Sequence, residues 1–219
     1  MGPLALAALL LSVPASAQVK NERGCTAAQQ KKIDDALPEA RKRVADAAKR
    51  VKEKDKDAEQ YGRLMLGAGY DNAEVGAILS FMAKELDGVT AHCSGAADKN
   101  CGSRNGYVRS GETGIMHLCP NFFDEKAIAV TASAAEKRIR TIVHESAHLA
   151  HPDIREPGGE SYCVLFTCED SCGDGPTDPG TNKSVPARVA DNWAQFVHCA
   201  SRRVPDAPET ITVSRPKKK

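Results

Sequence analysis

Apolar residues in the first part of the chain recur every three or four positions within highly charged sequence. Between residues 26 and 54 they form one narrow stripe: Ile33, Leu37, Ala40, Val44, Ala47 and Val51. This spacing is typical of one face of an α-helix and predicts a long amphipathic helix, which Pro38 should kink or restart. After a break at residues 67–70, Asp71 begins a second predicted helix that ends at Asp87-Gly88.

The middle of the chain changes to short runs typical of strands. Strands are predicted at residues 89–93, 107–109 and 115–119. The last two are expected to pair across the glycine-containing turn at residues 110–114. Pro120 should end the third strand, because proline cannot donate a backbone hydrogen bond to a sheet.

Two further helices are predicted in the second half. Ser133 and Glu136 have the spacing of a capping box, and the helix they begin should stop at Pro152. A last helix is expected over residues 186–203. Its inward-facing residues should be Val189, Trp193, Phe196 and Val197. The predicted fold class is therefore mainly α with a small β-hairpin or sheet.

Composition is consistent with one folded domain. The chain has 219 residues, 41% of them hydrophobic, and a net charge of +1, which predicts no nucleic-acid partner. Residues 4–13 are nearly all apolar and precede Ala15-Ser16-Ala17, so residues 1–17 are predicted to be a signal peptide. The apolar run is too short for stable membrane insertion. We expect one domain at residues 18–203, a disordered tail at 204–219, and a monomer that is secreted or periplasmic.

Eight cysteines support export, since all lie after the predicted cleavage near Ala17 and their number is even. A cysteine-only zinc site is disfavoured because the sequence contains no Cys-x-x-Cys pair. The cysteines are Cys25, Cys93, Cys101, Cys119, Cys163, Cys168, Cys172 and Cys199. Spacing alone does not determine how they pair.

The predicted helix after Ser133 contains the motif His144-Glu145-Ser146-Ala147-His148. Residues four apart share one face of a helix, so His144 and His148 can hold one zinc ion per chain. Glu145 is rotated by about 100° from them and can reach a water molecule on that metal. The motif predicts a zinc hydrolase in which Glu145 is the general base.

A zinc hydrolase needs a third protein ligand. His151 lies roughly 10 Å along the helix from His144, which is too far for one tetrahedral ion. Asp153 follows the helix stop too closely to turn back. Glu160 is better placed, because Pro157-Gly158-Gly159 lets the backbone reverse. Glu156 is the next candidate.

Several segments, in this order, resemble the aspzincin metallopeptidases, the deuterolysin and peptidyl-lysine endopeptidase group. They are Cys25 to Gln30, Asn105 to Val108, Ile115 to Phe123, Thr141 to His148, and Ala190 to Phe196. The resemblance covers most of the chain after residue 17. It implies a zincin-like metallopeptidase fold stapled by disulfides.

The resemblance also implies roles for individual residues. The family's third ligand is an aspartate in a Gly-Thr-x-Asp-x-x-Tyr-Gly segment, whose counterpart here is Gly158 to Cys163. Glu160 stands in place of this aspartate and is the expected zinc ligand. Tyr162 is expected to take the role of the family's tyrosine, whose hydroxyl donates a hydrogen bond to the oxyanion. The implied disulfides are Cys25–Cys93 and Cys101–Cys119, with Cys163–Cys199 favoured among the remaining cysteines.

The sequence therefore predicts a secreted zinc endopeptidase that acts on protein or peptide substrates. His144, His148 and Glu160 are its predicted metal ligands, and Glu145 and Tyr162 its catalytic residues. The replacement of aspartate by Glu160 motivates an alternative, a non-catalytic secreted module that binds zinc or a partner. A peptidase toxin acting on another cell is a third possibility.

Overall fold

The computed structural model describes residues 24–126, 133–154, 168 and 186–202. The predicted signal peptide and the predicted C-terminal tail lie outside these residues. The described elements are α1 (Ala27–Lys52), α2 (Lys56–Met65), α3 (Asn72–Gly88), β1 (Thr90–Cys93), β2 (Gly106–Tyr107), β3 (Ile115–Leu118), α4 (Pro120–Phe123), α5 (Ala134–Ala150), a 3-10 turn (Pro186–Arg188) and α6 (Ala190–Ser201). The predicted fold class, mainly helical with a small sheet, is confirmed.

Helix α1 is the long amphipathic helix that the apolar stripe predicted. Thr26 and Gln29 form a capping box at its start, and all six residues of the stripe are buried. The helix runs through Pro38 without interruption, so a restart at this position is wrong. Pro38 lies on the exposed side of the helix. There the carbonyl that loses its hydrogen bond can be solvated by water.

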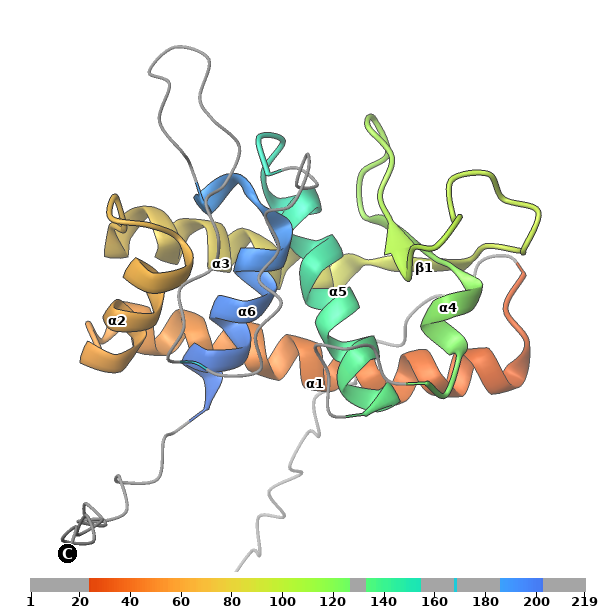
Figure 1. Cartoon of the computed structure of the whole chain (residues 1–219), viewed down its shortest axis with the longest axis horizontal. Helices are drawn as coiled ribbons and strands as arrows, with labels where there is room; N and C mark the ends of the chain where they lie inside the picture. The colour runs from red at the N-terminus through yellow and green to blue at the C-terminus, as the bar shows by residue number, and fades with distance from the viewer. Residues whose placement is uncertain (1–23, 127–132, 155–167, 169–185, 203–219) are drawn as a thin grey trace, which may run out of the picture.

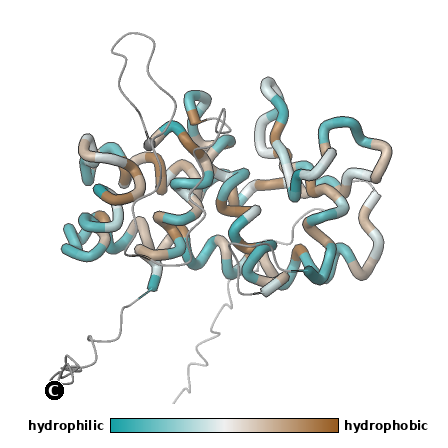
Figure 2. The backbone as a smooth tube through the Cα atoms, in the orientation of Figure 1, coloured by the Kyte–Doolittle hydropathy of each residue, from teal (hydrophilic) through white to brown (hydrophobic). Residues whose placement is uncertain are grey.

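Helix α5 packs against α1, α3 and α6 and is the central element of the fold. Figure 1 shows α1 along the lower edge, with α5 and α6 side by side above it, the sheet and α4 at one end and α2 at the other. Hydrophobic and hydrophilic positions alternate along the helices in Figure 2, as expected when each helix buries one face. No helix in the described part of the chain is long and apolar enough to span a membrane.

Helix α2 was not predicted from the sequence. Asp55 caps its first turn by accepting hydrogen bonds from the backbone N–H groups of Asp57 and Ala58. The ring of Tyr70 packs directly over Gly62, where a Cβ atom would lie 2.0 Å from the ring. Glycine at this position therefore lets the turn before α3 fold back onto α2.

The sheet has the strand order β1-β3-β2. The predicted pairing of β2 with β3 is confirmed and is antiparallel, whereas β1 pairs with β3 in parallel, which the sequence analysis did not predict. Met116 and Leu118 of β3 are buried in the main core. His117 lies between them and stacks on Tyr107, so β3 presents its two faces to different surroundings.

Three disulfides are formed within the described residues. Cys25–Cys93 ties the start of α1 to β1, and Cys101–Cys119 closes the segment around β2 and β3. Both pairings were implied by the resemblance and are confirmed. The third bond joins Cys168 to Cys199, so the favoured pairing of Cys163 with Cys199 is wrong. Cys163, Cys168 and Cys172 lie within ten positions of one another in the sequence, and their spacing does not decide which of them reaches α6.

Helix α5 begins as predicted, with the Ser133 hydroxyl accepting the backbone N–H of Glu136 at 3.1 Å. It ends at Ala150, two residues before Pro152. Buried Lys137 donates to the backbone oxygens of Asn121 and Asp124 at 2.7 and 2.9 Å, which fixes α5 to α4 at the end of β3. The sheet is thereby held against the helix that carries the histidines.

Candidate metal centre

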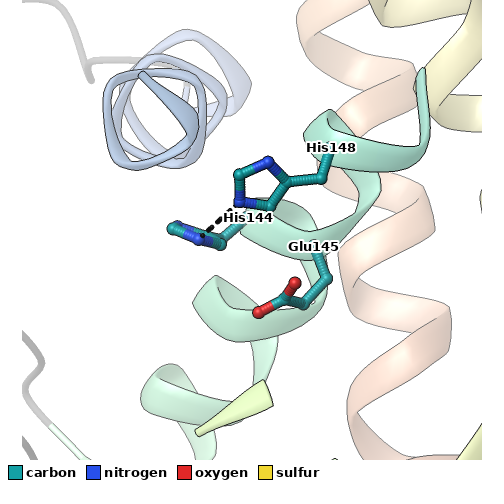
Figure 3. A group of neighbouring side chains, drawn as sticks. All are labelled: His144, Glu145 and His148. Atoms are coloured by element: carbon teal, nitrogen blue, oxygen red, sulfur yellow. Dashed lines mark hydrogen bonds between the residues drawn. The ribbon is translucent and has the colours of Figure 1, made fainter. Parts of the chain in front are cut away.

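His144, Glu145 and His148 form the group that could hold a metal ion in the described part of the chain. Figure 3 shows the three side chains extending from the same side of α5. Their potential ligand atoms all lie within 4.8 Å of one another. The group arises from local helix geometry, because positions 144 and 148 are one turn apart.

Each histidine has its Nδ1 atom fixed by an acceptor. His144 Nδ1 lies 3.0 Å from Oδ1 of Asp191 on α6, and His148 Nδ1 lies 2.9 Å from the backbone oxygen of Ile154. A carboxylate and a carbonyl only accept hydrogen bonds, so each Nδ1 carries the hydrogen. In a neutral imidazole the Nε2 atom is then unprotonated and can ligate a metal.

The two Nε2 atoms lie 3.2 Å apart. Two lone pairs at this distance repel each other unless a positive centre lies between them. Two nitrogens bound to one tetrahedral zinc at about 2.0–2.1 Å stand about 3.3 Å apart. The separation of the imidazole nitrogens therefore fits zinc, as the cofactor prediction required.

Glu145 lies between the helix and the sheet. Glu145 is only 2% exposed. A Cβ atom built on Gly106 of β2 would lie 3.1 Å from Oε1 of Glu145. The same Cβ would lie 3.2 Å from the backbone oxygen of His117 and from Cγ2 of Thr141. Glycine at this position lets β2 approach the Glu145 carboxylate closely.

The predicted third ligand and its alternatives do not extend the group formed by the motif within the described residues. Glu160, Tyr162 and the alternative ligand Glu156 are outside the described residues. Asp153 is exposed, and its backbone N–H donates to His151 Nδ1 at 3.2 Å in the turn after α5. Neither Asp153 nor His151 joins the group formed by the motif residues.

Asp191 is the site residue to which the sequence analysis gave no role. It is in the first turn of α6, 47 positions from the histidine it contacts. A metal-binding histidine requires an acceptor for its second nitrogen. Asp191 is the acid in the segment Ala190 to Phe196, which resembles the family. The need for such an acceptor could therefore have identified it from the sequence.

The fold and the motif define a class of protein. A helix with two histidines one turn apart, a glutamate beside them and a small sheet against it is the architecture of a zincin-like metallopeptidase. The family model described as lysine-specific metallo-endopeptidase, the aspzincin group, matches residues 71–162. The predicted resemblance to the aspzincin metallopeptidases is thereby confirmed over these residues.

The structure is also similar to a zinc peptidase from Grifola frondosa. The two chains share 18% sequence identity with a TM-score of 0.52, and the match covers 79% of this chain and 96% of the other. At this identity the match shows a common fold. Among curated proteins, none matches the sequence at a significant level.

Proposed function

We propose that the protein is a secreted zinc endopeptidase in which Glu145 acts as general base. His144, His148 and Glu160 hold the metal in this proposal, and Tyr162 donates a hydrogen bond to the oxyanion. The family relationship supplies the reaction class. The observation that carries the assignment is the pair of imidazoles whose Nε2 atoms face each other at 3.2 Å, with buried Glu145 beside them.

Zinc, when bound, lowers the pKa of a water molecule and polarises the scissile carbonyl. Glu145 takes the proton of the attacking water and passes it to the leaving amine. Its placement at the contact between α5 and β2 restricts its motion, because Gly106 brings the strand against its carboxylate. Asp191 and the carbonyl of Ile154 keep both imidazoles in the ligating tautomer.

Export is part of the proposal. The disulfides Cys25–Cys93, Cys101–Cys119 and Cys168–Cys199 support it, because such bonds persist in oxidising compartments. Cleavage after Ala17 would leave all six of these cysteines in the exported chain. We further propose that the protein acts as a monomer and without nucleic acid, in keeping with a net charge of +1.

The test compares the oxidised protein with Glu145→Gln and Glu160→Ala. Wild type should bind about one zinc per chain and cleave an unfolded protein such as reduced casein. Glu145→Gln should keep the zinc and lose about 10²–10⁴-fold in cleavage rate, the range for general-base catalysis. Glu160→Ala should lose most zinc affinity.

The outcomes separate the alternatives. Undiminished cleavage by Glu145→Gln would rule out the proposed general base. Zinc binding without turnover by the wild type at any pH would favour the non-catalytic secreted module. Retention of zinc by Glu160→Ala would assign the third ligand to another residue, and Glu156→Ala would then be measured.

A further inference from the structure

Helices α5 and α6 share a row of polar contacts that continues away from the metal centre. His144 contacts Asp191, Arg140 contacts Gln195, and Glu136 contacts His198. Positions 136, 140 and 144 are successive turns of α5, while 198, 195 and 191 run backwards along α6. The helices are therefore antiparallel, and their polar residues meet turn by turn (Figure 1).

Arg140 occupies the middle of this row. Its side chain is 10% exposed, and its Nη2 atom lies 3.9 Å from Oδ1 of Asp191, the oxygen that accepts from His144. The same nitrogen lies 3.5 Å from the backbone oxygen of Asp191. Burial lowers the pKa of the Arg140 guanidinium, while attraction to Asp191 and Glu136 opposes that effect. The guanidinium is thus located between the acids of two neighbouring turns.

Gln195 fixes the orientation of Arg140. Its Oε1 atom accepts from Arg140 Nη1 at 2.5 Å, and its Nε2 atom lies 3.5 Å from Sγ of Cys199. Cys199 is bonded to Cys168. The amide therefore has one neighbour on each side, which favours the orientation that presents its oxygen to Arg140.

We propose that Arg140 is a positioning residue of the metal centre: held by Gln195, it keeps the Asp191 carboxylate in place to accept from His144 Nδ1. The inference rests on the zinc site proposed above. A planar guanidinium has several donors in fixed directions, so it can restrict the rotation of a neighbouring carboxylate. Loss of Arg140 then loosens His144 through Asp191, without removing any atom that touches the metal.

The sign of the effect distinguishes this role from a long-range charge effect. Removing a positive charge near a cation site should by Coulomb's law strengthen zinc binding. Removing a positioning residue should weaken it, because outer partners of metal-binding histidines contribute about 10–100-fold to affinity. We expect the weakening to prevail, with a loss near the lower end of that range.

The experiment measures the zinc dissociation constant of the full, oxidised chain by competition with a chromogenic chelator. Arg140→Met and Arg140→Lys are prepared in the wild-type and Asp191→Asn backgrounds. In the wild-type background, Arg140→Met should weaken zinc binding about tenfold, and Arg140→Lys should recover part of that loss. In the Asp191→Asn background the Arg140→Met effect should fall below about twofold, because the residue through which it acts has changed.

Arg43→Met is the matched control. It also removes a guanidinium from the α5–α6 region, but Arg43 bonds Glu136 and not Asp191. It should lower the thermal midpoint and leave zinc affinity within about twofold.

Three results would overturn the inference while leaving the proposed function intact: unchanged affinity, tighter binding, or an equal loss in both backgrounds. If Arg140→Met fails to fold, Arg140→Lys alone decides by the same comparison of backgrounds. A wild-type protein that binds no zinc would overturn the proposed function and this inference together. If the wild type binds zinc and cleaves protein, the proposed function stands, and the Arg140 variants alone decide whether Arg140 positions Asp191.

Discussion

The two ends of the α5–α6 contact contain the same chemical pair in opposite settings. Near the end of α5, His144 of that helix bonds Asp191 of α6 at 3.0 Å. Near its start the roles are exchanged, and Glu136 of α5 bonds His198 of α6 at 2.9 Å. At the first pair the other imidazole nitrogen faces His148. At the second, Arg43 of α1 binds both oxygens of the carboxylate, at 2.5 and 2.9 Å.

The difference shows how one interface serves both stability and chemistry. The Glu136 pair contains its own cation, so its charges are compensated by the three helices that it joins. The His144 pair lies beside Arg140 and directs a ligating nitrogen toward a second imidazole, which is where a metal ion would bind. We therefore expect substitutions at the two pairs to differ, with metal affinity affected at the first and folding stability alone at the second.

The largest effect is expected for His144→Ala. Apparent zinc-binding free energies of about 10–16 kcal/mol are shared among three or four ligands, so zinc affinity should fall by about 10²–10³-fold. The thermal midpoint of the metal-free protein should also fall, because the side chain is largely buried at 12% exposure and bonds Asp191. Chelator competition and calorimetry of the metal-free protein measure the two quantities. Wild-type zinc affinity in this variant would show that His144 is not a ligand.

Asp191→Asn should weaken zinc binding by about 10–100-fold, because the amide keeps the size of the side chain and loses its charge. Asn can still accept from His144 Nδ1, so the loss should be smaller than for His144→Ala. The same competition assay measures it, with Asp153→Asn as the matched control at an exposed acid outside the group. Equal zinc affinities for Asp191→Asn and Asp153→Asn would show that Asp191 does not support zinc binding.

How far the sequence could predict this centre depends on the range of each contact. The proximity of His144, Glu145 and His148 could be predicted because it follows from helix geometry over five residues. The Ser133 cap and the stripe on α1 are local in the same sense. Asp191 is brought to His144 by the packing of two helices, which no spacing in the sequence encodes.

The same distinction explains the errors in the fold. The parallel pairing of β1 with β3 joins Thr90 to Ile115 across 25 positions, and alternation within each strand does not determine it. Pro38 was expected to disturb α1, but its ring lies on the exposed side of the helix. The Cys163–Cys199 pairing failed because three cysteines close together in sequence are equivalent until α6 is placed.

Glu136→Gln tests the other end of the contact. The change removes the charge that Arg43 and His198 share, and we expect a loss of about 2 kcal/mol in the free energy of unfolding of the metal-free protein. Zinc affinity should stay within about twofold of wild type, because Glu136 bonds Arg43 and His198 and lies about two turns of α5 before His144. Urea unfolding measures the first quantity and chelator competition the second. A large loss of zinc affinity would contradict the separation of the two pairs.

The smallest expected effect is the pH dependence of that stability difference. Desolvation raises the pKa of Glu136, but hydrogen bonds from His198 and Arg43 outweigh it and hold the pKa well below its usual value of 4.5. A carboxyl whose pKa is lowered by folding stabilises the protein above its unfolded pKa, and this contribution is lost as the pH falls toward the folded value.

The stability difference between wild type and Glu136→Gln should therefore be constant above about pH 6 and shrink as the pH falls below about 4.5. Thermal unfolding of the metal-free proteins between pH 7 and pH 3 measures it, and metal-free protein is used so that loss of zinc at acid pH does not contribute. Lys31→Gln, which removes an exposed ion pair with Asp35 on α1, is a control that should show little difference at any pH. A difference that grew toward acid pH would mean that folding raises the pKa of Glu136, and that the cluster carries a charge it does not compensate.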